Sequence, residues 1–169
     1  MKFAYADPPY LYCGRKHYGK LHTDAGVYDT VDGHAALIER LMQEFPDGWG
    51  LSLTSTSLWT LLPLCPSDVR VGAWVKPFAV FKPGINPAYA WEPVIFRGGR
   101  KLGRDVATVR DWCSVNITIK RGLTGAKPDL FCQWVFAMLG IRQGDELIDL
   151  FPGSGAVGRA WSDFQSRLL

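Results

Sequence analysis

The sequence lacks any apolar run long enough to cross a membrane, and it carries little net charge. No stretch approaches the roughly 20 apolar residues that a transmembrane helix needs. The first acidic residue, Asp7, comes too early to leave room for the apolar region of a signal peptide. The formal net charge is only +3, so overall charge does not indicate a nucleic-acid binder. We therefore expect a cytoplasmic protein with no membrane partner.

Cysteine is scarce, and no two cysteines have the spacing of a metal or redox motif. Because C-x-x-C is absent, we expect reduced thiols rather than a disulfide framework. Cys13 is followed by His17 and His22, but no fourth ligand has a suitable spacing, so the sequence predicts no metal site. Internal repeats and low-complexity tracts are also absent. The four cysteines are Cys13, Cys65, Cys113 and Cys132.

Apolar residues are plentiful by contrast. They make up 47% of the 169 residues and include seven tryptophans. A chain of this length forms one domain and buries about two thirds of the surface that its unfolded form exposes. We therefore expect a single domain over residues 1–169, with four of the tryptophans in its core: Trp49, Trp59, Trp74 and Trp134.

Short apolar runs alternate with segments of helical spacing. Strands are predicted at Lys2–Ala6, Trp49–Thr54, Val69–Val75, Ala88–Phe96 and Glu146–Leu150. Helices are predicted from an N-cap at Asp32 through Phe45, from a cap at Ser57 through Leu62, from Pro128 to a stop at Gly140, and from Ala156 to about Phe164. This alternation predicts an α/β fold, with a mostly parallel sheet and helices on both faces. Ligands bind beyond the carboxyl ends of the strands in such sheets.

The tetrapeptide Asp7-Pro8-Pro9-Tyr10 directly follows the first predicted strand. Two prolines fix two φ angles and remove two backbone donors, and Pro8 holds Asp7 extended. Such a stiff turn suits a flat ring that bears an amino group. The carboxylate of Asp7 and the carbonyl of Pro8 can accept the amine hydrogens, while Tyr10 stacks on the ring. Acceptors on both hydrogens make the amine of adenine or cytosine more nucleophilic, and a base in a duplex must first be flipped out.

A second turn, Phe151-Pro152-Gly153-Ser154-Gly155, follows the last predicted strand. Gly153 and Gly155 permit close backbone approach, and N–H groups at the start of the next helix can bind a carboxylate or ribose hydroxyls. Asp149, at the end of the strand, can accept bonds from a ribose or an amino group. Because both turns leave strands, we expect them to face one crevice although they are far apart in the sequence.

Two other segments lack a regular pattern. Residues 11–31 are rich in Gly, Tyr, His and Lys and are predicted to form a loop that serves the substrate. Residues 97–127 hold eight basic residues against two acidic ones. This excess favours phosphate contact, with ordinary solvated surface as the alternative. The candidate nucleic-acid contacts are Arg97, Arg100, Lys101, Arg104 and Arg110.

Together these motifs resemble the amino-methyltransferases of nucleic acids, which use S-adenosylmethionine (SAM) and carry the pattern Asp/Asn/Ser-Pro-Pro-Tyr/Phe/Trp. The order is circularly permuted, with the catalytic tetrapeptide first and the glycine turn last, and is similar to the β-type DNA methyltransferases and to the adenine-specific MT-A70-like enzymes. The short tail after Gly155 is similar to the latter, which usually have Trp where Tyr10 stands. The resemblance covers residues 2–161 and extends to three further segments, Trp74-Val75-Lys76, Trp91-Glu92-Pro93-Val94-Ile95-Phe96 and Lys127-Pro128.

The resemblance implies a minimal Rossmann-like methyltransferase domain and a role for each motif. Asp7, Pro8, Pro9 and Tyr10 would be the catalytic residues, with the amine held by Asp7 and Pro8 and the base stacked on Tyr10. Transfer of the methyl group would be a direct in-line displacement that needs positioning more than acid–base chemistry, and no metal is implied. The implied SAM site consists of Asp7, Lys127, Asp149, Phe151, Gly153 and Gly155.

The implied function is methylation of an exocyclic amine in DNA, at N6 of adenine, because Asp at position 7 favours adenine whereas Ser would favour cytosine. The sequence has no separate recognition domain. This suits relaxed specificity, a phage or other mobile element in a bacterial cell, or an oligomeric or specificity-giving partner. Two alternatives remain open: methylation of adenine in RNA, and an inactive nucleic-acid-binding or partner protein that keeps the fold.

Overall fold

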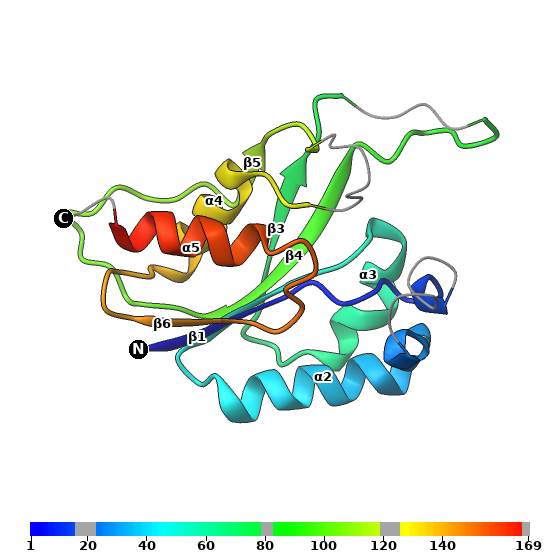
Figure 1. Cartoon of the computed structure of the whole chain (residues 1–169), viewed down its shortest axis with the longest axis horizontal. Coiled ribbons are helices and arrows are strands. Elements are labelled where there is room, and N and C mark those ends of the chain that lie inside the picture. Colours follow the sequence, from blue (N-terminus) through cyan, green and yellow to red (C-terminus); the bar gives the residue numbers. More distant parts are fainter. Residues whose placement is uncertain (16–22, 79–82, 119–125, 167–169) are drawn as a thin grey trace.

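Within the described part of the chain, six strands form one sheet (Figure 1). The computed structural model describes residues 1–15, 23–78, 83–118 and 126–166. The strand order is β5-β3-β4-β2-β1-β6. The strands are β1 (Lys2–Ala6), β2 (Gly48–Ser52), β3 (Arg70–Val75), β4 (Trp91–Gly98), β5 (Trp112–Ser114) and β6 (Glu146–Asp149).

All the strands except β4 run in one direction. β1 is parallel to both β2 and β6, β3 is parallel to β5, and β4 is antiparallel to its two neighbours, β2 and β3. The prediction of a mostly parallel sheet is therefore confirmed. The parallel strands end at the same side of the sheet, which we call the carboxyl edge. The antiparallel β4 begins at this edge.

Helices cover both faces of the sheet, as the sequence predicts (Figure 1). One face packs against α2 (Val31–Glu44) and α3 (Ser55–Leu61), and the other against α4 (Asp129–Leu139) and α5 (Ala156–Ser166). Short 3₁₀ helices lie at Thr23–Asp29 and Leu62–Leu64. Among the described residues, no helix has both the length and the apolar character that a membrane crossing requires.

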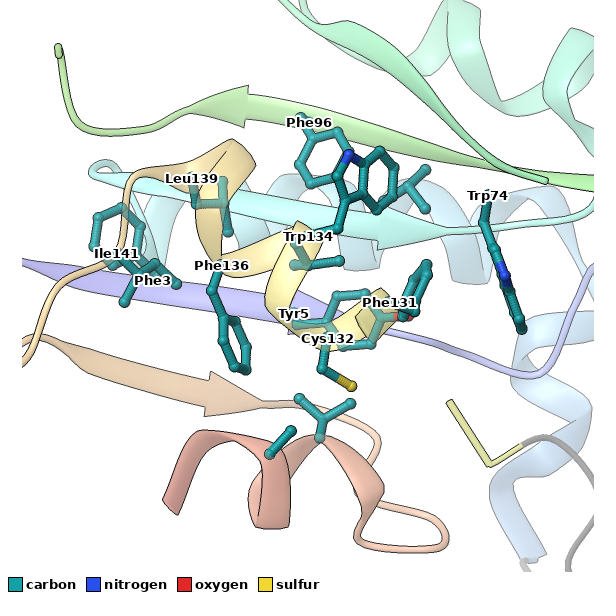
Figure 2. Packing of buried hydrophobic residues seen from close by; sticks show 14 residues of the cluster. Phe3, Tyr5, Trp74, Phe96, Phe131, Cys132, Trp134, Phe136, Leu139 and Ile141 are labelled. Carbon is teal, nitrogen blue, oxygen red and sulfur yellow. The ribbon is translucent and has the colours of Figure 1, made fainter. Parts of the chain in front are cut away.

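The central strand β1 contributes to both cores because successive side chains point to opposite faces. Phe3 and Tyr5 pack with Phe131 and other α4 residues in the core shown in Figure 2. Ala4 and Ala6 belong to the core under α2 and α3. A strand that is buried on both faces has a continuous apolar sequence. This is why β1 could be recognised from the sequence.

Three helix starts differ from those expected, whereas α5 begins at Ala156 as predicted. Thr30, not Asp32, caps α2, because its hydroxyl oxygen accepts the N–H of Gly33 at 3.1 Å. α3 begins at Ser55, so Ser57 lies inside the helix, where its hydroxyl donates to the carbonyl of Thr54. α4 begins one residue after Pro128. Gly140 ends α4 as expected, in the left-handed region at φ 63°.

Strand boundaries also shift, and one strand was not expected. β4 begins at Trp91 rather than Ala88 and continues to Gly98, and β2 ends at Ser52 rather than Thr54. β5 lies inside the basic stretch 97–127, where it pairs with β3 through the partners Ala73 and Trp112. Its three residues are too few to give a detectable alternation.

The prediction that Trp59 lies in the core is wrong. Its side chain is 90% exposed, whereas Trp49, Trp74 and Trp134 are buried as expected. α3 buries Ser57 and Leu61, and Trp59 lies on the outer face between them. A helix of seven residues gives too short a pattern to tell the two faces apart in the sequence.

Candidate active site

The two predicted turns lie side by side at the carboxyl edge. β1 and β6 are parallel neighbours in which Tyr5 is aligned with Asp149. The N–H of Leu150 continues the ladder by donating to the carbonyl of Tyr5 at 3.0 Å. Asp7 follows β1 and Phe151 follows β6, so the expectation that both turns face one crevice agrees with the topology. The charge of Asp7 is also close enough to act on the titration of Asp149.

The ammonium of Lys127 lies at the centre of this edge, just before α4. Its Nζ is 2.9 Å from Oδ1 of Asp7 and 3.7 Å from Oε2 of Glu92, and the side chain is only 6% exposed. It also donates to the hydroxyl of Tyr10 at 3.3 Å. The rings of Tyr10, Trp74 and Phe131 lie 5.8, 5.3 and 5.6 Å from Nζ. A buried cation is thus balanced by two carboxylates and three aromatic rings.

Glu92, near the start of β4, connects this cation to the Asp7–Tyr10 turn. Its Oε2 accepts the hydroxyl of Tyr10 at 2.9 Å, and its Oε1 forms an ion pair with Lys76. Burial alone would raise the pKa of Glu92, but Lys127 and Lys76 outweigh it and lower this pKa. Glu92 is therefore ionised at neutral pH, and it fixes the orientation of the Tyr10 ring.

Asp7 titrates differently from Glu92. Burial raises the pKa of Asp7, Lys127 opposes that rise, and the negative charge of Glu92 adds to it. Burial also raises the pKa of Tyr10 well above its usual range, so its hydroxyl stays neutral and can donate. The site therefore contains two carboxylates with opposite shifts, and such pairs are typical of functional sites.

The glycine turn supplies a second set of groups next to Asp7. Gly153 and Gly155 have φ angles of 43° and 71°, where a side chain would be strained. Oδ1 of Asp149 accepts the N–H of Phe151 at 3.2 Å, and burial raises the pKa of Asp149. The ring of Phe151 packs edge-on against Tyr28, with 5.1 Å between centroids. A carboxylate and the backbone amides before α5 thus lie close to the Asp7–Tyr10 turn.

Comparison with known proteins agrees with this architecture. No family model matches the sequence, and no curated protein matches it. A crystal structure of the M1.HpyAVI–SAM complex has a TM-score of 0.62 to this chain, covering 98% of this chain and 78% of that one at 13% sequence identity. The chain therefore shares the α/β fold of that structure. At this identity, the likeness concerns the fold alone.

Among the described residues, no group of three or more His, Cys, Asp or Glu side chains could hold a metal ion. His17 and His22, which follow Cys13 in the sequence, lie outside the described residues.

The basic stretch 97–127 contains both paired and exposed cations. Arg97 pairs with Asp68 at 2.9 Å, and the guanidinium of Arg110 lies 5.3 Å from the centre of the Trp112 ring. Lys101 and Arg104 are exposed. Their role as nucleic-acid contacts stays a prediction, and two further basic residues of the stretch, Lys120 and Arg121, lie outside the described residues.

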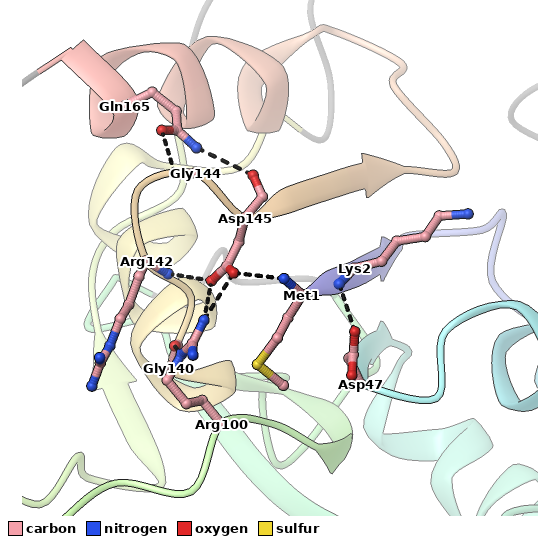
Figure 3. Close-up of polar contacts among 9 residues, drawn as sticks. All are labelled: Met1, Lys2, Asp47, Arg100, Gly140, Arg142, Gly144, Asp145 and Gln165. Carbon is pink, nitrogen blue, oxygen red and sulfur yellow. Dashed lines mark hydrogen bonds and ion pairs between the residues drawn. The ribbon is translucent and has the colours of Figure 1, made fainter.

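Arg100 lies at the opposite edge, where β1 and β6 begin (Figure 3). Its guanidinium donates to both carboxylate oxygens of Asp145 at 2.8 and 2.7 Å, and to the carbonyl of Gly140 at 3.0 Å. Asp145 also accepts the N–H of Arg142 and the amino group of Met1, each at 2.8 Å. This geometry gives Arg100 a part in joining α4 to β6, and its predicted contact with nucleic acid remains untested.

Sequence reasoning gave Glu92 and Lys76 no role of their own. Both lie in segments that carry the resemblance to the amino-methyltransferases, Trp74-Val75-Lys76 and Trp91–Phe96, but the resemblance implied no function for either residue. A signal was present, since Glu92 is an acidic residue next to the apolar run Pro93–Phe96. What made it significant is the antiparallel direction of β4, which brings the start of this strand to the edge where Asp7 lies.

Proposed function

We propose that this protein is a SAM-dependent methyltransferase that modifies the exocyclic amine of a flipped base in DNA, at N6 of adenine. One observation carries the proposal: the Asp7–Tyr10 turn and the glycine turn leave neighbouring parallel strands at the same edge. An amine held by the first turn and a methyl donor held by the second would therefore meet. The likeness of the fold to a structure of a SAM complex supports this proposal.

The target amine would bind at the Asp7–Tyr10 turn. The carboxylate of Asp7 and the carbonyl of Pro8 accept its two hydrogens, and Pro9 keeps the turn stiff. The Tyr10 ring stacks on the base, held in place through its hydroxyl by Glu92 at 2.9 Å. A preorganised ring lowers the entropic cost of capturing an extruded base.

The residues of the glycine turn fit SAM. The positive φ angles of Gly153 and Gly155 let the backbone approach a ligand closely, and α5 begins directly after them. Asp149 offers a carboxylate for ribose hydroxyls, Phe151 an apolar surface and Lys127 a cation. When bound, SAM supplies a methyl group on a positively charged sulfur.

Asp7 would also accept the proton that the methylated nitrogen has to lose. Its raised pKa makes it a better proton acceptor than an ordinary aspartate, whereas Glu92, with its lowered pKa, is a poor one. Lys127 keeps Asp7 ionised before the reaction, because the two groups are 2.9 Å apart.

The proposal is tested by incubating the purified protein with isotopically labelled SAM and unmethylated DNA, followed by mass spectrometry of the nucleosides. We expect label in N6-methyl-2′-deoxyadenosine from the DNA, and none with the Asp7→Asn variant. Label in N4-methyl-2′-deoxycytidine would show that the target base is cytosine, and label only in RNA supplied in parallel would show that the substrate is RNA.

An inactive protein is distinguished by calorimetry with SAM. Binding of SAM together with labelled DNA supports the proposal. Absence of both SAM binding and label, with either nucleic acid, would contradict it and favour a partner or scaffold protein.

A further inference from the structure

An open cavity of about 370 Å³ lies next to the candidate active site without belonging to it. It is bounded on one side by Ser55, at the start of α3, and on the other by residues 84–89 and Trp91. Its volume lies within the range of small-molecule sites. Among the described residues, no side chain that lines it carries a charge, so this lining suits a neutral group better than a phosphate or an acidic peptide.

The cavity opens at the carboxyl edge, but on the other face of the sheet from Asp7. Trp91 directly precedes Glu92 on β4, so their side chains point to opposite faces. Glu92 is aligned with Trp74, which belongs to the core under α4. Trp91 therefore points to the face that carries α3, which agrees with the presence of Ser55 in the same lining.

The aromatic residues around the cavity are exposed. Tyr89 is 51% and Trp91 38% exposed. Trp59, which is 90% exposed, follows Ser55 by four residues on α3 and so lies on the same face of that helix. Two large aromatic side chains, Tyr89 and Trp91, thus line the cavity, and exposed apolar surface gathered in one place marks an interaction site.

We propose that this cavity holds the unpaired nucleobase next to the methylated one in the same DNA strand. The inference rests on the proposed function. Trp91 and Tyr89 offer faces on which a base stacks, and Ser55 and Asn86 offer hydrogen-bonding groups for the edge of the base. A DNA strand that places one base against Tyr10 passes over the carboxyl edge. The neighbouring base then lies on the α3 face, with Trp59 beyond it.

The test measures binding to a single-stranded oligodeoxynucleotide that contains one adenine, by fluorescence anisotropy. Matched probes carry an abasic site on the 5′ or the 3′ side of that adenine. Tyr89→Ala and Trp91→Leu should weaken binding of the complete probe roughly 5- to 150-fold, the range measured for loss of base stacking. Trp91→Phe keeps an aromatic face and should bind within a few-fold of the natural protein.

The abasic probes decide the outcome. On one of the two abasic probes, every variant should bind with the same affinity as the natural protein, because the base that Tyr89 and Trp91 would contact is absent. The loss on the complete probe should also stay constant as salt rises, since stacking releases no counterions. Equal losses on all three probes, or no loss on any, would overturn the inference. Thermal unfolding curves show whether a variant is folded, and Tyr89 lies outside any helix or strand.

The same proteins separate this inference from the proposed function. Binding to the probes requires no methyl transfer. If the natural protein shows the base-dependent pattern of binding but never labels DNA, only the proposed methyl transfer is contradicted. If the natural protein and the Tyr89 and Trp91 variants label DNA equally, only the inference about the cavity is contradicted.

Discussion

At the scale of single side chains, the charges around Lys127 decide how the Asp7–Tyr10 turn titrates. One buried ammonium faces Asp7 and Glu92, and a second ammonium, on Lys76, is paired with Glu92. Glu92 therefore stays ionised at lower pH than an ordinary glutamate, while burial makes Asp7 easier to protonate. The turn keeps one fixed charge to position Tyr10 and one carboxylate that can take up a proton.

Asp7→Asn should reduce the rate of methyl transfer about 10²- to 10⁴-fold, the usual effect of losing a positioned proton acceptor. Affinity for SAM should change little, because the glycine turn is intact. Asp149→Asn is the matched control and should show the reverse, with SAM affinity reduced roughly 10- to 150-fold by loss of a hydrogen bond to a charged group. Single-turnover rates and calorimetry measure the two effects. Equal losses of rate and affinity in Asp7→Asn would assign Asp7 to the SAM site instead.

Glu92→Gln should move the acid limb of the kcat/KM profile to lower pH. The charge of Glu92 raises the pKa of Asp7 because a second negative charge nearby disfavours ionisation. Removing that charge lowers the pKa of Asp7, so the active, ionised form persists further into acid. A change in the same direction is not expected for Glu44→Gln, which removes an exposed carboxylate paired with Arg40. An acid limb that stays in place in Glu92→Gln would show that Asp7 does not control the profile.

At the scale of secondary structure, the two ends of the strand pair β1 and β6 have different roles. The carboxyl ends of β1 and β6 carry the candidate site, while their amino ends meet at Asp145. The Asp145 side chain is only 6% exposed and is surrounded by donors from Arg100, Arg142 and Met1 (Figure 3). These bonds hold the register of β6, and that register aligns Asp149 with β1.

Asp145→Asn should lower the free energy of unfolding by about 1.5–3 kcal/mol at neutral pH, the value of hydrogen bonds to a charged group. Hydrogen bonds from Met1 and Arg100 lower the pKa of Asp145 well below its usual range, although burial opposes this. The stabilisation is therefore fully present above the unfolded pKa of about 3.9 and disappears as pH falls through the folded value.

Denaturant unfolding of the two proteins at several pH values measures this effect. The difference between them should begin to shrink as pH falls below about 4, because the Asp145 carboxyl of the unfolded chain then takes up a proton while the folded one stays ionised. Asp105→Asn, at an exposed position, is the control and should leave stability within about 0.5 kcal/mol. A difference that is independent of pH would contradict the assigned role of the charge.

At the scale of the whole molecule, a net charge of +3 leaves DNA binding to local groups of cations. Arg97 and Arg100 already pair with Asp68 and Asp145, so their charges are partly neutralised. Lys101 and Arg104 are exposed and have no ion pair among the described residues. Among the described members of the stretch, they are best suited to contact phosphates.

Changing both Lys101 and Arg104 to Ala should weaken DNA binding and reduce the slope of log K against log salt by up to about 2, close to one for each lost phosphate contact. A double change of Lys2 and Arg40 to Ala removes the same charge from elsewhere on the surface. It should leave the slope unchanged. Titrations at several salt concentrations measure the affinity and the slope for each double variant. Identical slopes in the two variants would show that residues 97–127 are ordinary solvated surface.

Much of this protein could be predicted from its sequence because the signals were local. Two prolines stiffen the turn after Ala6, and Gly140 and Gly155 adopt left-handed backbone for which glycine is favoured. Buried strands such as β1 read as continuous apolar runs. Exact helix starts could not be predicted, because Thr30 and Asp32 are both good caps and only the contacts of the folded chain select one.

The residue types of the Asp7–Tyr10 turn and the glycine turn, and the alternation that builds the sheet, were determined by the sequence alone. Tertiary structure decided which charges lie around those turns, because this depends on strand direction. The antiparallel β4 brings Glu92 to Tyr10 and leaves Trp91 on the opposite face, and the order of β1 and β6 sets Asp149 beside the strand that Asp7 follows. Residues so far apart in the chain become neighbours only when hydrogen bonding between strands fixes their register.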